Sequence, residues 1–435
     1  AEVYTRVPRR DTQVVVYDDG EGWAQIAVRR LQALGYVQVS LLEGGLQGWF
    51  DAGGELFQDV NTPSKAFGEW VESIRHTPSL SAPEVQALIA SGTDMVVLDA
   101  RRWDEYQTMN IPTGVSVPGA ELVLRARAMA PNPQTRIVVN CAGRTRSIIG
   151  TQSLVNAGIP NPVVALRNGT IGWTLAGQRL ETGADRRFKD ITPEQLSQAQ
   201  SDARRVADRA GVARIDRAQL QRWCAQAHRT TYVCDVRAPE EYLSGHWPGS
   251  LSTQGGQLVQ ETDHTAAVRG ARFVLIDPLQ VRADMSASWL AQMGWEVAVL
   301  EGVTQADLTE TGPEQRPCPP VSGDFIEAAQ LASWLAQGDT WVVDLSSAAQ
   351  FIRGHIPEAL GMMRATLSFD VLRGLTQRAA APKRVVLTCA DGVASAHAQS
   401  DLRPALTLAQ VKASVHGLVG GVHRVVAHRP TLPVV

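Results

Sequence analysis

The sequence predicts an α/β fold made of tandem domains, each with a mostly parallel central sheet flanked by helices. Two observations carry this prediction. One motif recurs along the chain, and within each copy short strand-like runs alternate with helical patterns. The length agrees, because 435 residues are too many for one ordinary core and suggest three or four domains.

Three segments share a strand-like run that ends in aspartate: MVVLDARRWDEY, TYVCDVRAPEEY and TWVVDLSSAAQF. Each is followed by a second apolar run, RIVVNCAGRTRS, RFVLIDPLQVRA or RVVLTCADGVAS. The two runs lie 42, 42 and 45 residues apart, counted from Asp99 to Cys141, from Asp235 to Asp277 and from Asp344 to Cys389. Such agreement predicts three complete structural units.

A partial unit opens the chain. The segment QVVVYDDGEGWAQIAVRRLQALGYVQVSLLEGGLQGWFDAGG matches the back half of the repeat, with Asp18 where Cys141 would fall. Counting back one half-repeat from Asp18 runs off the start of the sequence. We therefore expect the front half of this unit to be missing and the native protein to be longer.

These repeats predict five segments. They are the C-terminal half of a first unit (1–60), a second domain (77–185), a helical linker (186–213), a third domain (214–312) and a fourth domain (322–435). The linker sequence TPEQLSQAQSDARRVADRAG is rich in Ala, Gln and charge, which favours a helix. FQDVNTPSKAFGEW bridges the first two units, and the Pro-rich stretch TETGPEQRPCPPVSG separates the last two.

The second unit shows the alternation of strands and helices in most detail. We expect helices at 82–91, 102–107 and 146–157 and strands at 95–99, 136–140 and 162–166. In parallel sheets, ligands bind at the carboxyl ends of the strands. Cys141 comes just after such an end.

Composition excludes several classes of protein. A formal net charge of −3 argues against a nucleic-acid binder, and no apolar run approaches the ~20 residues that cross a bilayer. The five cysteines are widely spaced and form no C-x-x-C pair, which is a poor framework for disulfides or zinc. We expect a cytoplasmic protein with no metal, flavin or nucleotide, because GVSVPG and LEGGLQGW do not form a phosphate-binding fingerprint.

The loop C-A-G-R-T-R-S joins a strand to a helix. Its backbone amides can point inward at the sulfur of Cys141 and add to the positive end of the helix dipole, while Gly143 permits a tight curl. Arg144 and Arg146 add formal charge, so the loop favours a nucleophilic thiolate. A strand-end cysteine is otherwise most often buried filler, which is our expectation for Cys224 and Cys234.

The remaining cysteine outside the repeats, Cys318, lies in the Pro-rich linker, and we expect it to be an incidental exposed thiol.

The features D-A-R-x-x-x-E-Y and C-A-G-R-T-R-S, together with the stretch E-G-G-L-Q-G-W, resemble the rhodanese homology domain of sulfurtransferases. The resemblance covers three full units and one half. It implies a ping-pong reaction in which a cysteine thiolate takes a sulfane sulfur from a donor such as thiosulfate and becomes a persulfide. The sulfur then passes to cyanide or to a thiol.

Carried over to this chain, the resemblance makes Cys141 the persulfide-forming nucleophile. Its outer sulfur would be cradled by the backbone amides of Ala142, Gly143, Arg144, Thr145, Arg146 and Ser147. Ser147 would also cap the following helix. The two arginines would attract an anionic donor, which favours thiosulfate.

Three residues match positions beside the family's site. Asp99 and Arg101 correspond to a structural Asp and Arg, and Glu105 pairs nearby; we expect Arg101 to be structural rather than catalytic. One departure is Asn110, which replaces the histidine found before the proline in the third and fourth units as His246 and His355. Because that histidine is chiefly structural in the family, the change leaves the reaction intact.

The copies differ at the nucleophile position. Asp18 and Asp277 cannot form a persulfide, so we expect the first and third units to be inactive packing partners. The fourth unit keeps Cys389 but lacks both loop arginines, carries Asp391 inside the loop and has Ser346 in place of Arg101. Cys389 is therefore a possible second nucleophile, with a different donor or a relay role.

Two alternatives remain. The first is a largely non-catalytic scaffold or sulfur carrier, which the two aspartate-substituted loops favour. The second is a cysteine phosphatase or arsenate reductase, whose loops place five residues between Cys and Arg. Here only four residues separate Cys141 from Arg146, and the smaller ring suits a single sulfur atom better than phosphate.

Overall fold

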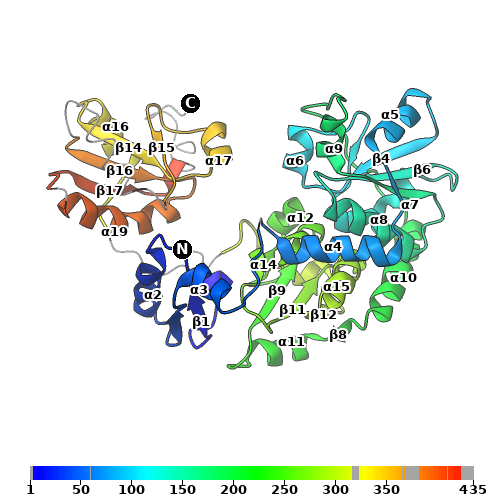
Figure 1. Cartoon of the computed structure of the whole chain (residues 1–435), viewed down its shortest axis with the longest axis horizontal. Coiled ribbons are helices and arrows are strands. Elements are labelled where there is room, and N and C mark those ends of the chain that lie inside the picture. Colours follow the sequence, from blue (N-terminus) through cyan, green and yellow to red (C-terminus); the bar gives the residue numbers. More distant parts are fainter. Residues whose placement is uncertain are drawn as a thin grey trace. The chain divides into compact units, whose positions relative to one another are not determined.

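The computed structural model describes residues 3–58, 60–315, 323–364, 367, 382–408 and 410–422. The chain divides into two compact units, one spanning Thr5–Arg316 and the other combining Pro317–Val435 with Ala1–Tyr4. Figure 1 shows three five-stranded sheets with their helices and one smaller, two-stranded sheet. All the strand pairs in these sheets are parallel.

The sheet of the second domain has the strand order β3-β7-β6-β4-β5. Its strands are β3 (Ser79–Leu80), β4 (Met95–Asp99), β5 (Val115–Ser116), β6 (Arg136–Asn140) and β7 (Val163–Leu166). The register pairs Asp99 with Asn140, so the carboxyl ends of the two central strands lie side by side. This pairing brings the Asp99 turn next to the loop that begins at Cys141.

Helices flank this sheet. They are α5 (Ala82–Ala90), α6 (Trp103–Thr108), α7 (Leu122–Met129), α8 (Thr145–Ala157) and α9 (Gly169–Leu175), with a short 3₁₀ turn η1 (Gly119–Glu121) before α7. All six elements expected in this domain are confirmed, with ends within one residue of the expected positions. A capping box between Ser81 and Glu84 fixes the start of α5.

The third domain repeats the same strand order as β10-β9-β11-β12-β8. Its elements are β8 (Ala213–Ile215), α11 (Arg217–Cys224), β9 (Thr231–Asp235), α12 (Pro239–Ser244), β10 (Leu251–Ser252), α13 (Gly255–Gln260), α14 (Thr262–Thr265), β11 (Arg272–Ile276), α15 (Val281–Gln292), β12 (Glu296–Leu300) and the turn η2 (Gln305–Asp307).

The fourth domain has the order β13-β17-β16-β14-β15. Its described elements are β13 (Phe325–Ile326), α16 (Ala328–Leu335), β14 (Thr340–Asp344), α17 (Ala348–Arg353), β15 (Leu360–Gly361), β16 (Arg384–Thr388), α19 (Val393–Leu408) and β17 (Ser414–Leu418). The common order in three sheets confirms the tandem α/β fold.

The opening segment contains half of this pattern. Strands β1 (Val14–Val16) and β2 (Val39–Leu41) form the two-stranded sheet. Helix α2 (Trp23–Ala33) lies between them in sequence, α3 (Gly45–Asp51) follows, and the short α1 (Val3–Arg6) precedes. Strands β1 and β2 occupy the places of β6 and β7 in the second domain.

Two linkers are helical. The helix expected between the second and third domains is confirmed as α10 (Pro193–Arg209), whose first turn is capped by Thr192 through the amide of Gln195. The bridge between the first two units contains α4 (Thr62–Arg75), a helix that the sequence did not predict. Helix α4 packs on α8, where Gly68 allows close approach to Thr145.

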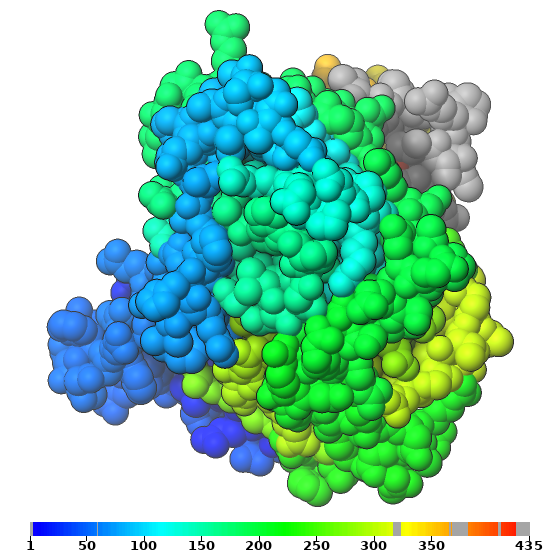
Figure 2. All heavy atoms as spheres, turned by 90° about the vertical axis from the view of Figure 1, so that its right-hand side faces the viewer, coloured from blue at the N-terminus to red at the C-terminus, as the bar shows by residue number. Residues whose placement is uncertain are grey.

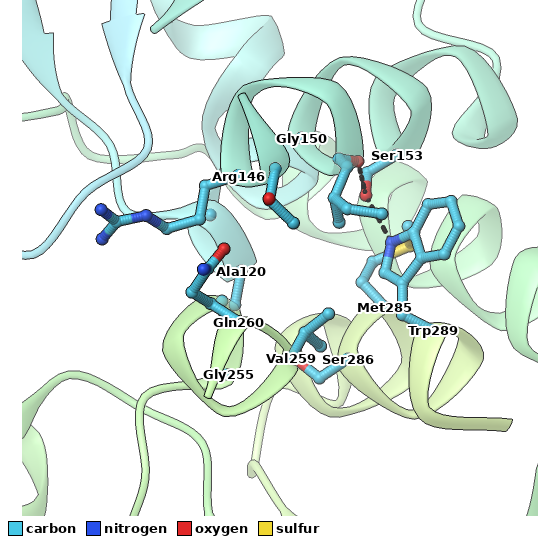
Figure 3. A pocket seen from close by; sticks show the side chains of 14 residues that line it. Ala120, Arg146, Gly150, Ser153, Gly255, Val259, Gln260, Met285, Ser286 and Trp289 are labelled. Carbon is cyan, nitrogen blue, oxygen red and sulfur yellow. Dashed lines mark hydrogen bonds between the residues drawn. The ribbon is translucent and has the colours of Figure 1, made fainter. Parts of the chain in front are cut away.

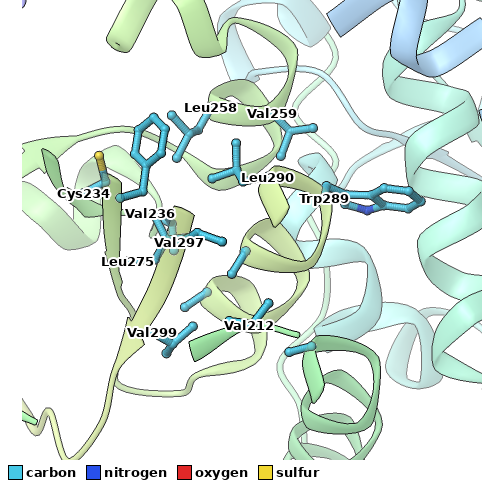
Figure 4. Close-up of a cluster of buried hydrophobic side chains, with 14 of the residues drawn as sticks. Val212, Cys234, Val236, Leu258, Val259, Leu275, Trp289, Leu290, Val297 and Val299 are labelled. Carbon is cyan, nitrogen blue, oxygen red and sulfur yellow. The ribbon is translucent and has the colours of Figure 1, made fainter. Parts of the chain in front are cut away.

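The second and third domains share a core. Helix α10 packs against α7, α8 and α15, and one hydrophobic cluster contains Ile148 and Ile149 of α8 together with Trp289 of α15. In Figure 4, Trp289 extends from the third domain's core toward α8, and its indole donates a hydrogen bond to Ser153 at 2.8 Å. Figure 2 shows the two domains joined over a continuous surface.

A buried ion pair closes the turn after each Asp-ending strand in these two domains. Arg101 binds Asp99 at 2.7 Å, and Arg237 binds Asp235 at 2.6 Å, with all four side chains at most 3% exposed. In the fourth domain, Ser346 replaces the arginine. There one oxygen of the buried Asp344 has no hydrogen-bond partner among the described residues.

Arg237→Ser is expected to destabilise the third domain by about 3–5 kcal/mol, because it leaves the buried Asp235 carboxylate unpaired. Hydrogen exchange of peptides from β9 and β11 measures this change within the intact chain. Arg222→Ser, which removes an exposed arginine from α11, is the matched control. Unchanged exchange in the Arg237 variant would contradict the structural role of the pair.

Candidate functional site

The loop that carries Cys141 is anchored by the start of α9. The amide of Thr170 donates to the carbonyl of Cys141 at 2.9 Å, and the amide of Ile171 donates to the carbonyl of Ala142 at 3.0 Å. Gly169 makes this approach possible, because it has a φ of +52° and a Cβ there would lie 2.1 Å from the Cys141 oxygen. The first turn of α9 therefore holds the loop through two of the loop's carbonyl groups.

The Cys141 side chain is buried, with 2% of its surface exposed. Its thiol lies 3.4 Å from the hydroxyl of Ser147, which in turn donates to the carbonyl of Arg144 at 2.9 Å. The expectation that Ser147 caps α8 is wrong. The helix already begins at Thr145, so Ser147 is its third residue and its hydroxyl faces the sulfur and the loop carbonyl.

Arg146 is held by Glu105. Two hydrogen bonds of 2.7 and 2.8 Å join the guanidinium to the carboxylate, and a third, of 3.1 Å, reaches Gln257 of the third domain. Burial would lower the pKa of Arg146, but Glu105, followed by Cys141 and Asp99, raises it above its ordinary value. The guanidinium therefore stays charged beside the cysteine loop.

Arg144 points to a different partner. Its guanidinium lies 2.8 Å from Glu69 and also pairs with Glu72, both on α4. Sequence analysis missed these glutamates, because they belong to a segment interpreted as a plain bridge. The signal was their i, i+3 spacing in E-W-V-E, which places both on one face of a helix.

The Asp99 turn lies beside the loop. The side-chain amide of Asn140, the last residue of β6, donates a hydrogen bond of 2.8 Å to the carboxylate of Asp99. The guanidinium of Arg101 donates hydrogen bonds to the same carboxylate and to the carbonyl of Met109. Arg101 is 3% exposed and fully engaged, an arrangement that favours the structural role expected for it.

Asn110 makes the same hydrogen bond to a backbone carbonyl as the histidine that stands at its position in the third domain. Its side-chain amide donates to the carbonyl of Tyr106 at 3.3 Å. In the third domain the ring of His246 makes the same contact with Tyr242 at 2.8 Å. The substitution therefore preserves the local fold.

The aspartate-substituted loops hold a carboxylate where the other copies have a thiol. Asp277 accepts hydrogen bonds from the amides of Leu279 at 3.1 Å and Arg282 at 2.9 Å. Asp18 accepts from the amides of Gly20 at 3.2 Å and Ala24 at 2.8 Å, and these bonds, that of Ala24 first, lower the pKa of Asp18. In both copies the loop amides converge on an anion.

The loop of the fourth domain is less favourable to a thiolate. The amide and hydroxyl of Ser395 lie 3.4 and 3.5 Å from the Cys389 sulfur, but a carboxylate oxygen of Asp391 lies 3.4 Å from it as well. Burial raises the pKa of the Cys389 thiol, and the negative charge of Asp391 raises it further. The hydrogen bonds from Ser395 lower this pKa, but they do not cancel the rise.

Two of the other cysteines can be placed. Cys234 is buried as expected, and burial raises its pKa to about 12. Cys224 was expected to be buried, but it is exposed, because α11 ends there at the surface. Cys318 lies outside the described residues. Within the described ranges, no group of three or more His, Cys, Asp or Glu side chains could hold a metal ion.

Comparisons with known proteins identify the family of these domains. The family model described as "Rhodanese-like domain" matches residues 1–52, 81–176 and 327–428, which together make up more than half of the chain. The chain belongs to the rhodanese-like family. The third domain lies outside the matched ranges, although its sheet has the same strand order as that of the second domain.

Two relatives carry the same name. A crystal structure of thiosulfate sulfurtransferase from Pseudomonas aeruginosa is 56% identical, with a TM-score of 0.90, and the match covers 100% of this chain and 81% of that one. Thiosulfate sulfurtransferase from Azotobacter vinelandii is 29% identical over 143 residues, 32% of this rhodanese-like chain. The match spans about half, 52%, of the Azotobacter protein.

In the part of the chain that the structure describes, no helix is both long enough and apolar enough to cross a bilayer.

Asp391→Asn is expected to lower the pH midpoint for alkylation of Cys389 by about half a unit to one unit, because it removes a negative charge beside the sulfur. Iodoacetamide labelling at several pH values, followed by mass spectrometry of the Cys389 peptide, measures the shift. Asp401→Asn, on the following helix, is the control. A midpoint that does not move would show that Asp391 has no influence on the thiol.

Proposed function

We propose that this protein is a sulfurtransferase that carries a sulfane sulfur on Cys141, with thiosulfate or a related anion as donor and cyanide or a thiol as acceptor. Membership of the rhodanese-like family and the two relatives named thiosulfate sulfurtransferase support rhodanese-type transfer of sulfur from small molecules.

The observation that carries the proposal is the carboxylate in the loops of Asp18 and Asp277. A carboxylate oxygen lies two bonds beyond Cβ, and the outer sulfur of a cysteine persulfide lies two bonds beyond the same atom. In both aspartate loops the oxygens at this position accept hydrogen bonds from loop amides. The Cys141 loop, which has the same place in the fold, would hold an anionic outer sulfur in the same manner.

The reaction then has two displacement steps. The Cys141 thiolate attacks the outer sulfur of thiosulfate, a new S–S bond forms, and the bond to the sulfonate sulfur breaks, so that sulfite leaves with the electron pair. Cyanide next attacks the outer sulfur of the persulfide. Thiocyanate leaves, and the thiolate of Cys141 is restored.

The surroundings of the sulfur favour a small donor. Cys141 is only 2% exposed, which leaves little room for a large donor to reach the sulfur. Arg146 is paired with one carboxylate, that of Glu105, whereas Arg144 is paired with two, those of Glu69 and Glu72. Of the two loop arginines, we therefore assign attraction of the donor chiefly to Arg146.

Cys141→Ser is expected to lower formation of thiocyanate from thiosulfate and cyanide by at least about a hundredfold, because serine cannot form a persulfide. A colorimetric thiocyanate assay on the full chain measures the loss. Cys224→Ser, which changes an exposed thiol outside both loops, is the matched control.

A parallel Cys389→Ser variant tells whether the fourth domain contributes. Full activity in the Cys141 variant would overturn the assignment of the nucleophile. Absence of thiocyanate from the native protein would favour the scaffold or sulfur-carrier alternative, and hydrolysis of an aryl phosphate would favour a phosphatase.

Glu69→Gln combined with Glu72→Gln is expected to lower the KM for thiosulfate by about two- to fivefold, the scale of one exposed ion pair, because the change releases the charge of Arg144. The effect should decrease as salt is added, since exposed charges are screened. Steady-state kinetics at two ionic strengths test it, with the exposed Glu43→Gln as control. A KM that rises or stays constant would show that Arg144 does not face the donor.

A further inference from the structure

The second and third domains are related by an approximate two-fold arrangement. Asp99 and Asp235 are equivalent positions of the two domains, and the same number of residues separates Glu121 from Gln257. Glu121 and Gln257 are therefore equivalent positions as well. Glu121 lies in the 3₁₀ turn η1, and Gln257 lies in the first turn of α13. These two turns meet at the interface, where a Cβ on Gly256 would lie 2.9 Å from the Cα of Gly119. The backbones of the two turns are therefore in direct contact.

Each turn sends one side chain across the interface to the loop arginine of the other domain. Glu121 accepts a hydrogen bond from Arg282 at 2.8 Å, and Gln257 accepts one from Arg146 at 3.1 Å. Figure 3 shows Arg146 on α8 at the edge of a pocket of about 30 Å³ that residues of both domains line, with α13 on its other side. The two contacts occupy equivalent places, but their chemistry differs.

The difference is one of charge. On the inactive side, Arg282 binds three carboxylates, those of Asp277, Glu241 and Glu121. The positive charge there is more than neutralised.

On the cysteine side, Arg146 binds one carboxylate, that of Glu105, and the neutral amide of Gln257. The Arg146 side chain is only 12% exposed, so water screens its charge weakly. Its field at the cysteine loop therefore depends on whether the residue at position 257 is charged. The other titratable groups that act on Arg146 are Asp99 and Cys141 itself.

We propose that Gln257 is a positioning residue for the Cys141 site. Its side-chain oxygen orients Arg146, and its lack of charge keeps the guanidinium available to stabilise the thiolate and an anionic donor. The third domain, which has Asp277 at the nucleophile position, thus completes the site of the second domain. The donor part of this inference rests on the function proposed above, whereas the effect on the thiolate does not.

Gln257→Glu tests the inference with little change in shape. We expect the pH midpoint for alkylation of Cys141 to rise by about half a unit, which makes labelling about threefold slower below the midpoint. We also expect the KM for thiosulfate to rise by about threefold or more, with a smaller change in kcat. Labelling with iodoacetamide, read from the Cys141 peptide by mass spectrometry, gives the first value, and thiocyanate formation gives the second.

Two controls isolate the contact. Gln254→Glu places the same charge at the N-cap of α13, on a side chain for which no hydrogen bond to Arg146 is seen among the described residues, and Glu121→Gln makes the mirror change at Arg282 on the inactive side. Both are expected to leave the Cys141 midpoint and the KM unchanged. Thermal unfolding of each variant confirms that the fold is retained.

The outcomes separate the two proposals. Equal effects of Gln257→Glu and Gln254→Glu on the alkylation midpoint would overturn the role of Gln257. If the native protein forms no thiocyanate, the proposed function fails, but the alkylation midpoint still decides the role of Gln257. A Gln257→Ala variant that changes neither value would overturn the orienting part of the inference.

Discussion

The site depends on one constraint, which is that loop amides converging at the end of a central strand require a negative partner. In the first and third copies the partner is built into the chain as the carboxylate of Asp18 or Asp277. In the second copy the same place belongs to Cys141, and in the fourth to Cys389. The four loops therefore differ chiefly in the side chain at this place, which is a carboxylate in two copies and a cysteine in the other two. A carboxylate occupies the amides by itself, whereas the proposed function assigns them to the outer sulfur of a persulfide on Cys141.

Much of this arrangement is encoded locally and could be predicted. The repeated Asp-ending strand, the second apolar run and the glycine-rich turns placed the elements of the second domain to within one residue, because apolar periodicity decides them. The resemblance to the rhodanese family placed Asp99 beside the Cys141 loop, and the pairing of Asp99 with Asn140 agrees with it. Asn110 was also interpreted well, since a short amide can reach the carbonyl that histidine reaches in the other copies.

The charge balance of the site could not be predicted, because it depends on residues distant in sequence. Two loop arginines suggested a strongly positive site. One of them is paired with Glu69 and Glu72 on a helix that was not foreseen, and the other meets Glu105 and a residue from another domain. The role of Ser147 was wrong for a local reason, since the helix starts three residues earlier than a cap at that position needs. Patterns within one segment indicate which groups exist, but not which of them meet.

The shared core between α8 and α15 has a consequence for how the chain can diverge. Once its own loop is filled by Asp277, the third copy is free of chemical demands at that loop, yet Trp289 and the helix that carries it remain part of the neighbour's interior. Substitutions can therefore accumulate in the Asp277 loop of the third domain, but not along α15. Selection on the function of the second domain would then preserve the helices of the third domain that pack against it. For that reason the third domain would persist in the gene even without a cysteine at its own loop.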